Sequence, residues 1–360
     1  MSNKAVAFFS RPVLTGASTG TGISACALRI YQALEKTHYI RTYTSFRSVP
    51  AYHSILSVLV YDFLSPFIFL IKNFRQRFDS LFFIEPSQAI WIGLLAVWYK
   101  PVNVCVLVHD CFFLENMSPY SLYSRYFYRK AIRRSTKILT TTYENAEQIF
   151  RVFGRMAQVL PLGPSLDTDT PLSDPNQIKY NHEPLRIGYI GSSVPRKRLL
   201  SFLKLIKKLA HEEIVAEYIL AGPIDAVTLR TLRLSVEAHA KYATLRYLGC
   251  ISEAEKPEFY HALHVLFFPT SLEGYGMPVV EAAYFGLPCF VLKDARLPRF
   301  IKNMCFEDTE EFLEIQRYVA YMSSPSSESL HDDREHYLDK ILRNQAEVRC
   351  LDWNRFSEVV

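Results

Sequence analysis

The 360-residue sequence lacks the cysteine patterns that mark a disulfide framework or a structural zinc site. Its seven cysteines are odd in number and scattered, and no two of them form a C-x-x-C pair. The simplest interpretation is a set of reduced, mostly buried thiols in a cytoplasmic protein. A signal-peptide pattern is also missing, because the first apolar run is only about as long as a strand. We therefore expect a cytoplasmic location.

A long uninterrupted apolar run is absent as well. Ser54–Ile71 is apolar and aromatic, but Asp62 and Pro66 interrupt it, so no membrane-spanning helix is expected. Basic residues extend this region to Ser54–Arg77, and a second aromatic and basic cluster covers Arg125–Arg134. Two interpretations stay open for both regions. They are buried helices with a solvated basic face, which the sequence favours, or a peripheral contact with an anionic membrane on its inner face.

Strong charge of either sign is missing too. The formal net charge is +5, which fits an anionic substrate or an anionic membrane surface. It is too weak to argue for nucleic acid by itself, and neither a recognition helix nor aromatic and basic strands are evident. No nucleic-acid partner is therefore expected.

Short apolar runs alternate with amphipathic stretches along the chain. The runs expected to be strands are Ala5–Phe9, Leu81–Glu85, Val104–Val108, Lys137–Thr141, Arg186–Ile190, Glu217–Ala221, Leu245–Leu248, Val265–Phe268 and Cys289–Leu292. Helical stretches between them include Ser24–Glu35, Arg198–Leu209 and Ala226–His239. Continuous apolar strands separated by helices predict an α/β fold with parallel, doubly wound sheets.

A polar stretch rich in proline, aspartate and asparagine interrupts this series between Gly163 and Pro184. Since 360 residues exceed what one hydrophobic core usually organises, we predict two Rossmann-like domains, over residues 1–165 and 185–335. Residues 166–184 would be the linker. Ligands in such folds bind beyond the carboxyl ends of the strands, which predicts a site in a cleft between the domains.

The most informative run is Ser271–Pro288, which reads Ser-Leu-Glu-Gly-Tyr-Gly-Met-Pro-Val-Val-Glu-Ala-Ala-Tyr-Phe-Gly-Leu-Pro. Glu273 precedes a glycine-containing loop, and Glu281 lies inside the helix that this loop opens. Pro278 suits the first turn of that helix. A strand, a glycine loop and a helix form an anion site, because free N–H groups and the positive helix end face the same point. Two carboxylates beside an anion site predict a ligand with phosphates and hydroxyls, such as a nucleotide sugar.

A second chemical element is the basic turn after the first strand of the second domain. It brings Arg196 and Lys197 to the start of the next helix, where the helix dipole disfavours cations. A diphosphate bound between this turn and the Glu273 loop would offset that repulsion, whereas the alternative is a solvated basic turn. The expected position of both segments at one sheet edge favours the diphosphate.

Glu273 and Glu281, with seven residues between them, resemble the signature of the retaining family 4 glycosyltransferases of the GT-B fold. The triplet Pro195–Lys197 is similar to the Pro-Arg-Lys-Asn variant of mannosyltransferase-like members. Further similar segments are Val108–Asp110, Leu139–Thr142, Val159–Gly163, Leu248–Ser252 and Glu253–Leu263. The chain departs from the pattern at Arg299, where glutamate is frequent, at Arg198, which replaces the asparagine, and at Thr142, where serine is usual.

This resemblance implies a role for each matching residue. Glu281 would bind the ribose hydroxyls, Glu273 and the loop amides would hold the donor sugar and phosphates, and His109 would line the sugar site from the opposite domain. The implied donor-binding residues are Glu281, Gly274, Tyr275, Gly276, Met277 and Gly191, and the implied catalytic residues are Glu273, Lys197, Arg196 and His109. Gly20 and Gly22 would form an N-terminal glycine loop near the diphosphate or the acceptor.

The resemblance further implies a retaining transferase that moves a hexose from a nucleotide diphosphate sugar to a hydroxyl of a glycan or lipid-linked acceptor. The Pro-Arg-Lys pattern leans towards mannose as the hexose, and surface polysaccharide synthesis would be the setting. Residues 1–165 would hold the acceptor, residues 185–335 the donor, and residues 336–360, as a C-terminal helix, would pack towards the first domain. An alternative of another class is a catalytically silent glycosyltransferase-like subunit that binds a partner enzyme.

No metal or other cofactor is expected, because fixed cations and N–H donors can stabilise the leaving diphosphate. Asp167 and Asp169 spell the D-x-D of metal-dependent sugar transferases, but they lie in the polar linker and are interpreted as a solvated pair. His261 and His264 have no nearby carboxylate or cysteine to complete a metal site. The glycines of residues 16–22 lack the Lys-Ser/Thr ending of a P-loop.

Overall fold

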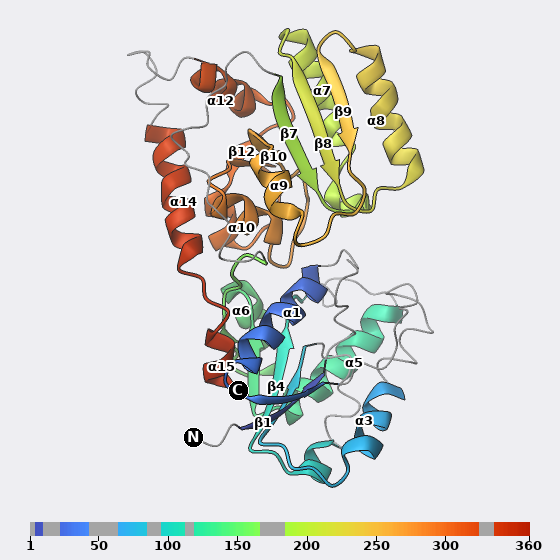
Figure 1. Cartoon of the computed structure of the whole chain (residues 1–360), viewed down its shortest axis with the longest axis vertical. Helices are drawn as coiled ribbons and strands as arrows, with labels where there is room; N and C mark the ends of the chain where they lie inside the picture. The colour runs from blue at the N-terminus through green and yellow to red at the C-terminus, as the bar shows by residue number, and fades with distance from the viewer. Residues whose placement is uncertain are drawn as a thin grey trace. The chain divides into compact units, whose positions relative to one another are not determined.

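The computed structural model describes residues 4–9, 22–42, 64–84, 95–111, 119–165, 184–323 and 335–360. The chain divides into two compact units, which are described separately here: Met1–Leu162 with Asp352–Val360, and Gly163–Leu351. Each unit contains a six-stranded parallel sheet with helices packed against it (Figure 1). The predicted α/β class with two doubly wound sheets is therefore confirmed.

The sheet of the first unit has the order β2-β1-β3-β4-β5-β6, and all five neighbouring pairs are parallel. Its strands are β1 (Ala5–Phe9), β2 (Tyr39–Thr42), β3 (Ser80–Phe83), β4 (Asn103–Val108), β5 (Lys137–Thr140) and β6 (Gln158–Val159). Its helices are α1 (Gly22–Glu35), α3 (Ser65–Asn73), α5 (Pro119–Arg134), α6 (Tyr143–Phe153) and α15 (Arg355–Val359). The four strands predicted from apolar runs are the central ones.

The sheet of the second unit has the order β12-β11-β10-β7-β8-β9 and is also parallel throughout. Its strands are β7 (Leu185–Ile190), β8 (Ala216–Ala221), β9 (Ala243–Tyr247), β10 (Val265–Phe267), β11 (Cys289–Leu292) and β12 (Phe306–Asp308). Its helices are α7 (Ser201–His211), α8 (Ala226–Ala238), α9 (Lys256–His261), α10 (Met277–Tyr284), α11 (Arg299–Met304), α12 (Leu313–Ser323) and α14 (Lys340–Arg349), with a 3-10 turn at Pro195–Lys197 and a π-helical turn at Glu335–Asp339.

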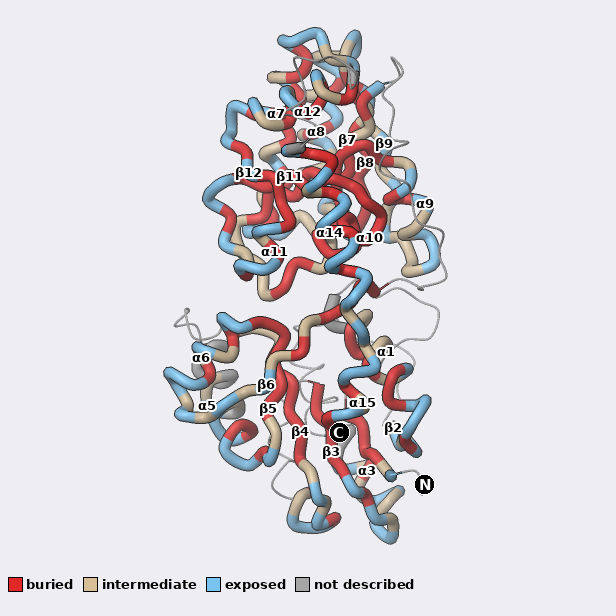
Figure 2. The backbone as a smooth tube through the Cα atoms, turned by 90° about the vertical axis from the view of Figure 1, so that its left-hand side faces the viewer, coloured by how far each residue is buried: buried red, intermediate tan, exposed pale blue. Residues whose placement is uncertain are grey.

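Three strands were not predicted from the sequence, and all three lie at sheet edges: β2, β6 and β12. An edge strand has one open side, so it does not need the continuous apolar run that identifies a central strand. In β2, for example, Tyr39 and Arg41 are exposed. The central strands, in contrast, are buried along most of their length (Figure 2).

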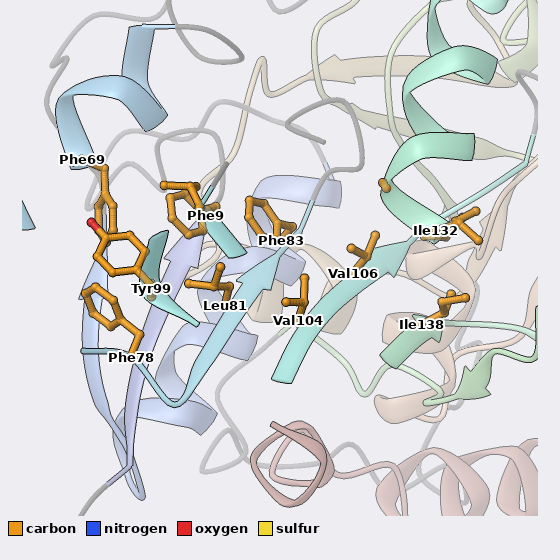
Figure 3. Packing of buried hydrophobic residues seen from close by; sticks show 14 of the residues in the cluster. Phe9, Phe69, Phe78, Leu81, Phe83, Tyr99, Val104, Val106, Ile132 and Ile138 are labelled. Carbon is orange, nitrogen blue, oxygen red and sulfur yellow. The ribbon is translucent and has the colours of Figure 1, made fainter. Parts of the chain in front are cut away.

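Phenylalanine rings fill much of the core of the first unit. Phe9 of β1 and Phe83 of β3 stack with ring centroids 4.6 Å apart, and Phe69 of α3 meets Phe9 edge-on at 4.8 Å. Phe78 and Tyr99 form another edge-on pair at 5.0 Å (Figure 3). These contacts hold α3 against one face of the sheet through Phe69, which is 1% exposed.

The last two residues of the chain accept hydrogen bonds from three strands of the first unit. The carbonyl of Val360 accepts hydrogen bonds from Ser80 Oγ at 2.8 Å and from Asn103 Nδ2 at 3.3 Å, while Lys137 Nζ donates to the Val359 carbonyl at 2.5 Å. Three neighbouring strands, β3, β4 and β5, are therefore joined by one terminal segment.

The division of the C-terminal region differs from the expectation that residues 336–360 all pack towards the first domain. Helix α14 belongs to the second unit, where it contacts α10. Gln345 donates to the Tyr284 carbonyl at 3.2 Å, and Asn344 donates to the Met304 carbonyl at 2.8 Å. Helix α14 is therefore packed against α10 within the second unit. Of residues 336–360, those from Asp352 to Val360 belong to the first unit.

All seven cysteines are free, and only Cys250 and Cys350 are exposed. The prediction that most of these thiols are buried is confirmed. Among the helices that the structure describes, none has both the length and the apolar character needed to cross a bilayer.

Glycine is required where the loops after β7 and β8 approach each other. A Cβ atom at Gly222 would lie 2.2 Å from the carbonyl oxygen of Gly191, and φ of Gly222 is +111°. We expect Gly222→Ala to lower the free energy of unfolding by about 3 kcal/mol, since backbone must move and a strained dihedral is added. Urea unfolding would measure it. Gly249→Ala is the control, because its φ is +70° and nothing lies within 4 Å of the added Cβ. An equal effect of both substitutions would contradict the steric argument.

Candidate active site in the second unit

The basic turn and the glutamate loop meet at one edge of the second sheet. The turn Pro195–Lys197 follows β7, and the loop containing Glu273 follows β10, which pairs directly with β7. Since the carboxyl ends of parallel strands share an edge, the two segments come together. Ser271 N donates to the Arg196 carbonyl at 2.7 Å, and the Arg196 guanidinium donates to the Leu272 carbonyl at 2.8 Å. The expected proximity of the two segments is therefore observed.

Glu273 lies at the centre of a charged cluster. Its carboxylate is 2.7 Å from Lys197 Nζ and 3.0 Å from the Arg196 guanidinium, and it accepts a hydrogen bond from Thr270 Oγ1 at 2.6 Å. The side chains of Glu273 and Lys197 are only 9% and 11% exposed, whereas that of Arg196 is 44% exposed. The Lys197 ammonium also lies 4.7 Å from the centroid of the Phe268 ring. Two cations and one anion leave this cluster with a net positive charge.

The structure corrects the sequence argument about what offsets these cations. Arg196 and Lys197 lie in a 3-10 turn that ends before α7 begins at Ser201, so they are not at the amino end of that helix. Glu273 pairs with both of them within the protein itself and offsets part of their charge. A bound diphosphate is therefore not needed to explain why the two cations are there.

The pKa values of Glu273 and Lys197 reflect their oppositely charged partners, since Glu273 has two cations beside it and Lys197 has one carboxylate. Burial alone would raise the pKa of Glu273, but Lys197 and Arg196 together outweigh it and hold that pKa below the usual 4.5. Burial lowers the pKa of Lys197, and its single carboxylate partner opposes this only in part because Arg196 repels it. Glu273 is therefore a firmly ionised group with two cations beside it.

The loop after Glu273 leads into α10 through a left-handed residue. Gly276 has φ of +103°, and a Cβ atom there would lie 3.0 Å from Ile301 Cγ2. Pro278 occupies the first turn of α10, as predicted. Within the described part of the chain, no group accepts a hydrogen bond from the amides of Gly274, Gly276 or Met277. These N–H groups, at the positive end of a helix and beside two cations, can bind an anion.

Glu281 lies deeper, in the middle of α10, and is 1% exposed. It is 2.8 Å from Lys256 Nζ and accepts hydrogen bonds from Tyr260 OH at 2.7 Å and from Ser165 Oγ. Lys256 also contacts Glu253 at 2.9 Å and Ser165 at 3.0 Å. A ribose hydroxyl would have to share or displace one of these partners, so the ribose role of Glu281 stays a prediction.

Three members of this buried network were not identified from the sequence: Ser165, Lys256 and Tyr260. Lys256 and Tyr260 are four residues apart and therefore lie on the same face of α9, which is the one sequence signal that could have found them. Ser165 gave no signal, because it comes from the segment that follows the first unit.

The remaining predicted residues are spread over both units. Gly191 follows β7 and lies against Gly222, whereas Gly22 begins α1 of the first unit and Gly20 lies outside the described residues. His109 follows β4 of the first unit, where burial lowers its pKa to about 4. Its Nε2 is buried without a hydrogen-bond partner among the described residues. The roles implied for Gly22 and His109 stay predictions.

Two of the departures from the resembled motif, Arg198 and Arg299, lie among the described residues of the second unit. Arg198, in place of asparagine, has φ of +47° and donates to both carboxylate oxygens of Asp294 at 2.7 Å. Asparagine tolerates this left-handed region better than most residues, so the ion pair with Asp294 helps to hold arginine there. Arg299 is the first residue of α11.

His261 and His264, which were not expected to bind a metal, contact other groups of the second unit. His261 meets the ring of Phe285 edge-on at 4.8 Å, and His264 Nδ1 lies 3.1 Å from the amide of Arg186. In the part of the chain that the structure covers, no three His, Cys, Asp or Glu residues are arranged to hold a metal ion. Asp167 and Asp169 lie outside the described residues.

Comparisons with known proteins find a family similarity over part of the chain that includes this site. Residues 173–304 match the model of a family described as glycosyl transferases group 1. O-antigen chain mannosyltransferase B from Escherichia coli is 26% identical over 113 residues, which are 31% of this chain and 30% of that protein. The matched segment therefore spans less than a third of this relative's length.

Solved structures resemble the chain along nearly its whole length, at low sequence identity. Sucrose-phosphate synthase from Thermosynechococcus elongatus has a TM-score of 0.74 at 13% identity and covers 99% of this chain and 97% of its own. HepE from Anabaena, solved with UDP and glucose, has a TM-score of 0.69 at 14% identity, with 99% and 98% coverage. WaaG, a glycosyltransferase involved in lipopolysaccharide biosynthesis, has a TM-score of 0.64 at 15% identity and covers 98% of both chains. Residues 173–304 therefore resemble a glycosyl transferases group 1 domain, and the chain as a whole has the GT-B fold.

Proposed function

We propose that the protein transfers a hexose from a nucleotide diphosphate sugar to a hydroxyl acceptor, with retention of anomeric configuration. The observation that carries this proposal is the cluster of Arg196, Lys197 and Glu273. It lies beside the start of α10, where, among the described residues, backbone N–H groups have no hydrogen-bond acceptor. Cleavage of a sugar–diphosphate bond adds negative charge to the leaving group. Cations and N–H donors that are already in place lower the energy of that charge without reorganisation.

The roles in the proposed reaction follow from burial and charge. Arg196, the most exposed of the three charged groups, and the amides of the α10 loop would contact the diphosphate. Glu273 would keep both cations positioned and accept hydrogen bonds from sugar hydroxyls. The attacking hydroxyl would approach on the face of the leaving diphosphate, which would accept its proton. This chemistry needs no metal ion if the fixed positive charge is sufficient, and we propose that it is.

The donor and acceptor are proposed only as classes. HepE was solved with UDP-glucose and with UDP and glucose, and the relative from Escherichia coli is a mannosyltransferase. These relatives support a nucleotide-activated hexose as donor. The O-antigen and lipopolysaccharide relatives support a glycan acceptor in surface polysaccharide synthesis. The further proposal is a lipid-linked form of this acceptor, used by a cytoplasmic enzyme at the inner face of the membrane.

Donor hydrolysis tests the proposal directly. Purified protein would first be screened with UDP, GDP, ADP and their hexose conjugates for an increase in melting temperature, because a ligand that binds only the folded state stabilises it. With the stabilising conjugate, Glu273→Ala is expected to reduce slow hydrolysis of the donor by about 10²–10³-fold, as loss of one transition-state group typically does.

Glu310→Ala is the matched control, because Glu310 pairs with Lys204 at an exposed position on the same unit. It should leave hydrolysis unchanged. A catalytically silent subunit would show no hydrolysis to lose, and full activity in Glu273→Ala would contradict the proposed site.

A further inference from the structure

Helix α3 of the first unit exposes an apolar stripe on the face opposite its buried contact. Leu64, Phe67, Ile71 and Phe74 recur every three or four residues, and each is between 44% and 56% exposed. This spacing places them on one side of the helix. The other side is held in the core by Phe69, which points towards Tyr99 and Phe78 (Figure 3).

A second segment extends the stripe. The helical residues 95–99 bury Leu95 and Tyr99 but expose Val97 and Trp98, which are 74% and 53% exposed. The indole N–H of Trp98 donates to the Phe74 carbonyl at 3.1 Å, so this ring lies against the end of α3. The α3–Trp98 surface is defined here as Leu64, Phe67, Ile71, Phe74, Val97 and Trp98.

Cations border this surface, and anions are absent from the segments that form it. Residues 64–78 and 95–102 contain no aspartate or glutamate. Their basic residues are Lys72, Arg75, Arg77 and Lys100, and all four are exposed. The guanidinium of Arg75 lies 5.1 Å from the centroid of the Phe74 ring, so charge and aromatic surface are immediate neighbours.

We propose that the α3–Trp98 surface docks on an anionic lipid bilayer. Exposed aromatic and aliphatic side chains enter the boundary between headgroups and acyl chains, while the surrounding cations contact anionic headgroups. Self-association is disfavoured, because a two-fold contact through this surface would bring the four cations of one copy against those of the other. This inference rests on the proposed function, because a bilayer bound by the α3–Trp98 surface would be the one that carries the lipid-linked acceptor.

The same comparison distinguishes the two regions, Ser54–Arg77 and Arg125–Arg134, for which the sequence left membrane contact open. In the described part of α5, Ala131 and Ile132 are buried, whereas Arg129, Lys130, Arg133 and Arg134 are exposed. Its one exposed ring, among the side chains described there, is Tyr126, with the Lys130 ammonium 4.4 Å from its centroid. That arrangement matches the interpretation of a packed helix with a solvated basic face. Helix α3 has instead an exposed apolar stripe beside its cations, which a purely solvated helix does not need.

Vesicle co-sedimentation tests the proposal with the full chain. We expect binding to vesicles with about one third phosphatidylglycerol in phosphatidylcholine, and none to pure phosphatidylcholine. Ile71→Ser/Trp98→Ser should weaken binding by at least about tenfold, since each exchange removes apolar surface that would enter the interface. Lys72→Glu/Arg75→Glu should weaken it to a similar extent, because each basic residue near an anionic surface contributes roughly fivefold.

Matched controls are available on the same unit. Arg129→Glu/Arg133→Glu makes the same change of charge on α5, and Phe150→Ser removes an aromatic side chain that is 55% exposed on α6. Both should bind vesicles as the unchanged protein does. Melting temperatures would confirm that every variant is folded.

Three results would overturn the proposal: no binding to anionic vesicles, equal weakening by the α5 variant, or a dimer in solution that Ile71→Ser/Trp98→Ser dissociates. The nucleotide-induced melting shift of the second unit should be unchanged in Ile71→Ser/Trp98→Ser. Failure of membrane docking is therefore distinguishable from failure of the proposed transferase activity.

Discussion

Replacing Lys197 with methionine is expected to lower the free energy of unfolding by about 3 kcal/mol and to abolish the proposed glycosyl transfer. Methionine keeps an apolar chain against Phe268 but removes the cation that lies 2.7 Å from the Glu273 carboxylate. Glu273 then stays buried with only Arg196 and Thr270 as partners. Urea unfolding would measure stability, and donor turnover would measure activity.

The double variant Lys197→Met/Glu273→Leu separates the two effects. Removing both charges leaves no stranded carboxylate, so most of the lost stability should return while activity stays absent. Lys204→Met, which breaks the exposed contact with Glu310, is the surface control and should change stability by less than about 1 kcal/mol. If the double variant were as unstable as Lys197→Met, the charge-pair argument would be wrong.

The dependence of stability on acidic pH tests the Lys197–Glu273 ion pair independently. The folded-state pKa of Glu273 lies below its ordinary value of 4.5. Its contribution to stability is therefore present in full above pH 4.5 and is lost as the pH falls through the folded-state pKa. The difference in stability between the unchanged protein and Glu273→Gln should accordingly shrink below pH 4.5.

Replacing Lys256 with methionine is expected to lower the free energy of unfolding by about 4 kcal/mol. Lys256 is the cation next to Glu281, whose side chain is 2% exposed, and it also contacts Glu253. Burial would lower the pKa of Lys256, but Glu281 and Glu253 outweigh it and raise that pKa above 10.5. Methionine would leave the Glu281 carboxylate in an almost water-free position, where its remaining donors among the described residues are the hydroxyls of Ser165 and Tyr260.

Donor binding distinguishes a positioning role of Lys256 from a purely structural one. If Glu281 contacts the ribose, Lys256→Met should reduce the melting shift produced by the donor nucleotide in addition to reducing stability. Glu253→Gln is the control, because Glu253 is 39% exposed and its loss should change stability by about 1 kcal/mol. A loss of stability in Lys256→Met with an unchanged nucleotide shift would mean that the network only holds α9 and α10 together.

The sequence by itself determined the α/β class, the central strands of both sheets and the run from Ser271 to Pro288. These features are local or periodic. A central parallel strand must be apolar on both faces, and a helix that follows a glycine loop leaves proline and glycine at defined positions. The proximity of the Arg196 turn and the Glu273 loop was also predictable, because strands of a parallel sheet end at one edge.

Only the tertiary structure decided which groups compensate the charges. Glu273 could be recognised as an acid from its motif, but its pairing with Lys197 depends on two loops from distant parts of the chain. Glu281 likewise meets Ser165, more than a hundred residues away, and Lys256 of another helix. The edge strands β2, β6 and β12 and the exposed face of α3 were equally hidden, since whether an apolar residue is covered depends on what packs against it. Spacing along a chain encodes period and local turns, whereas burial and ion pairing arise only once separate segments share space.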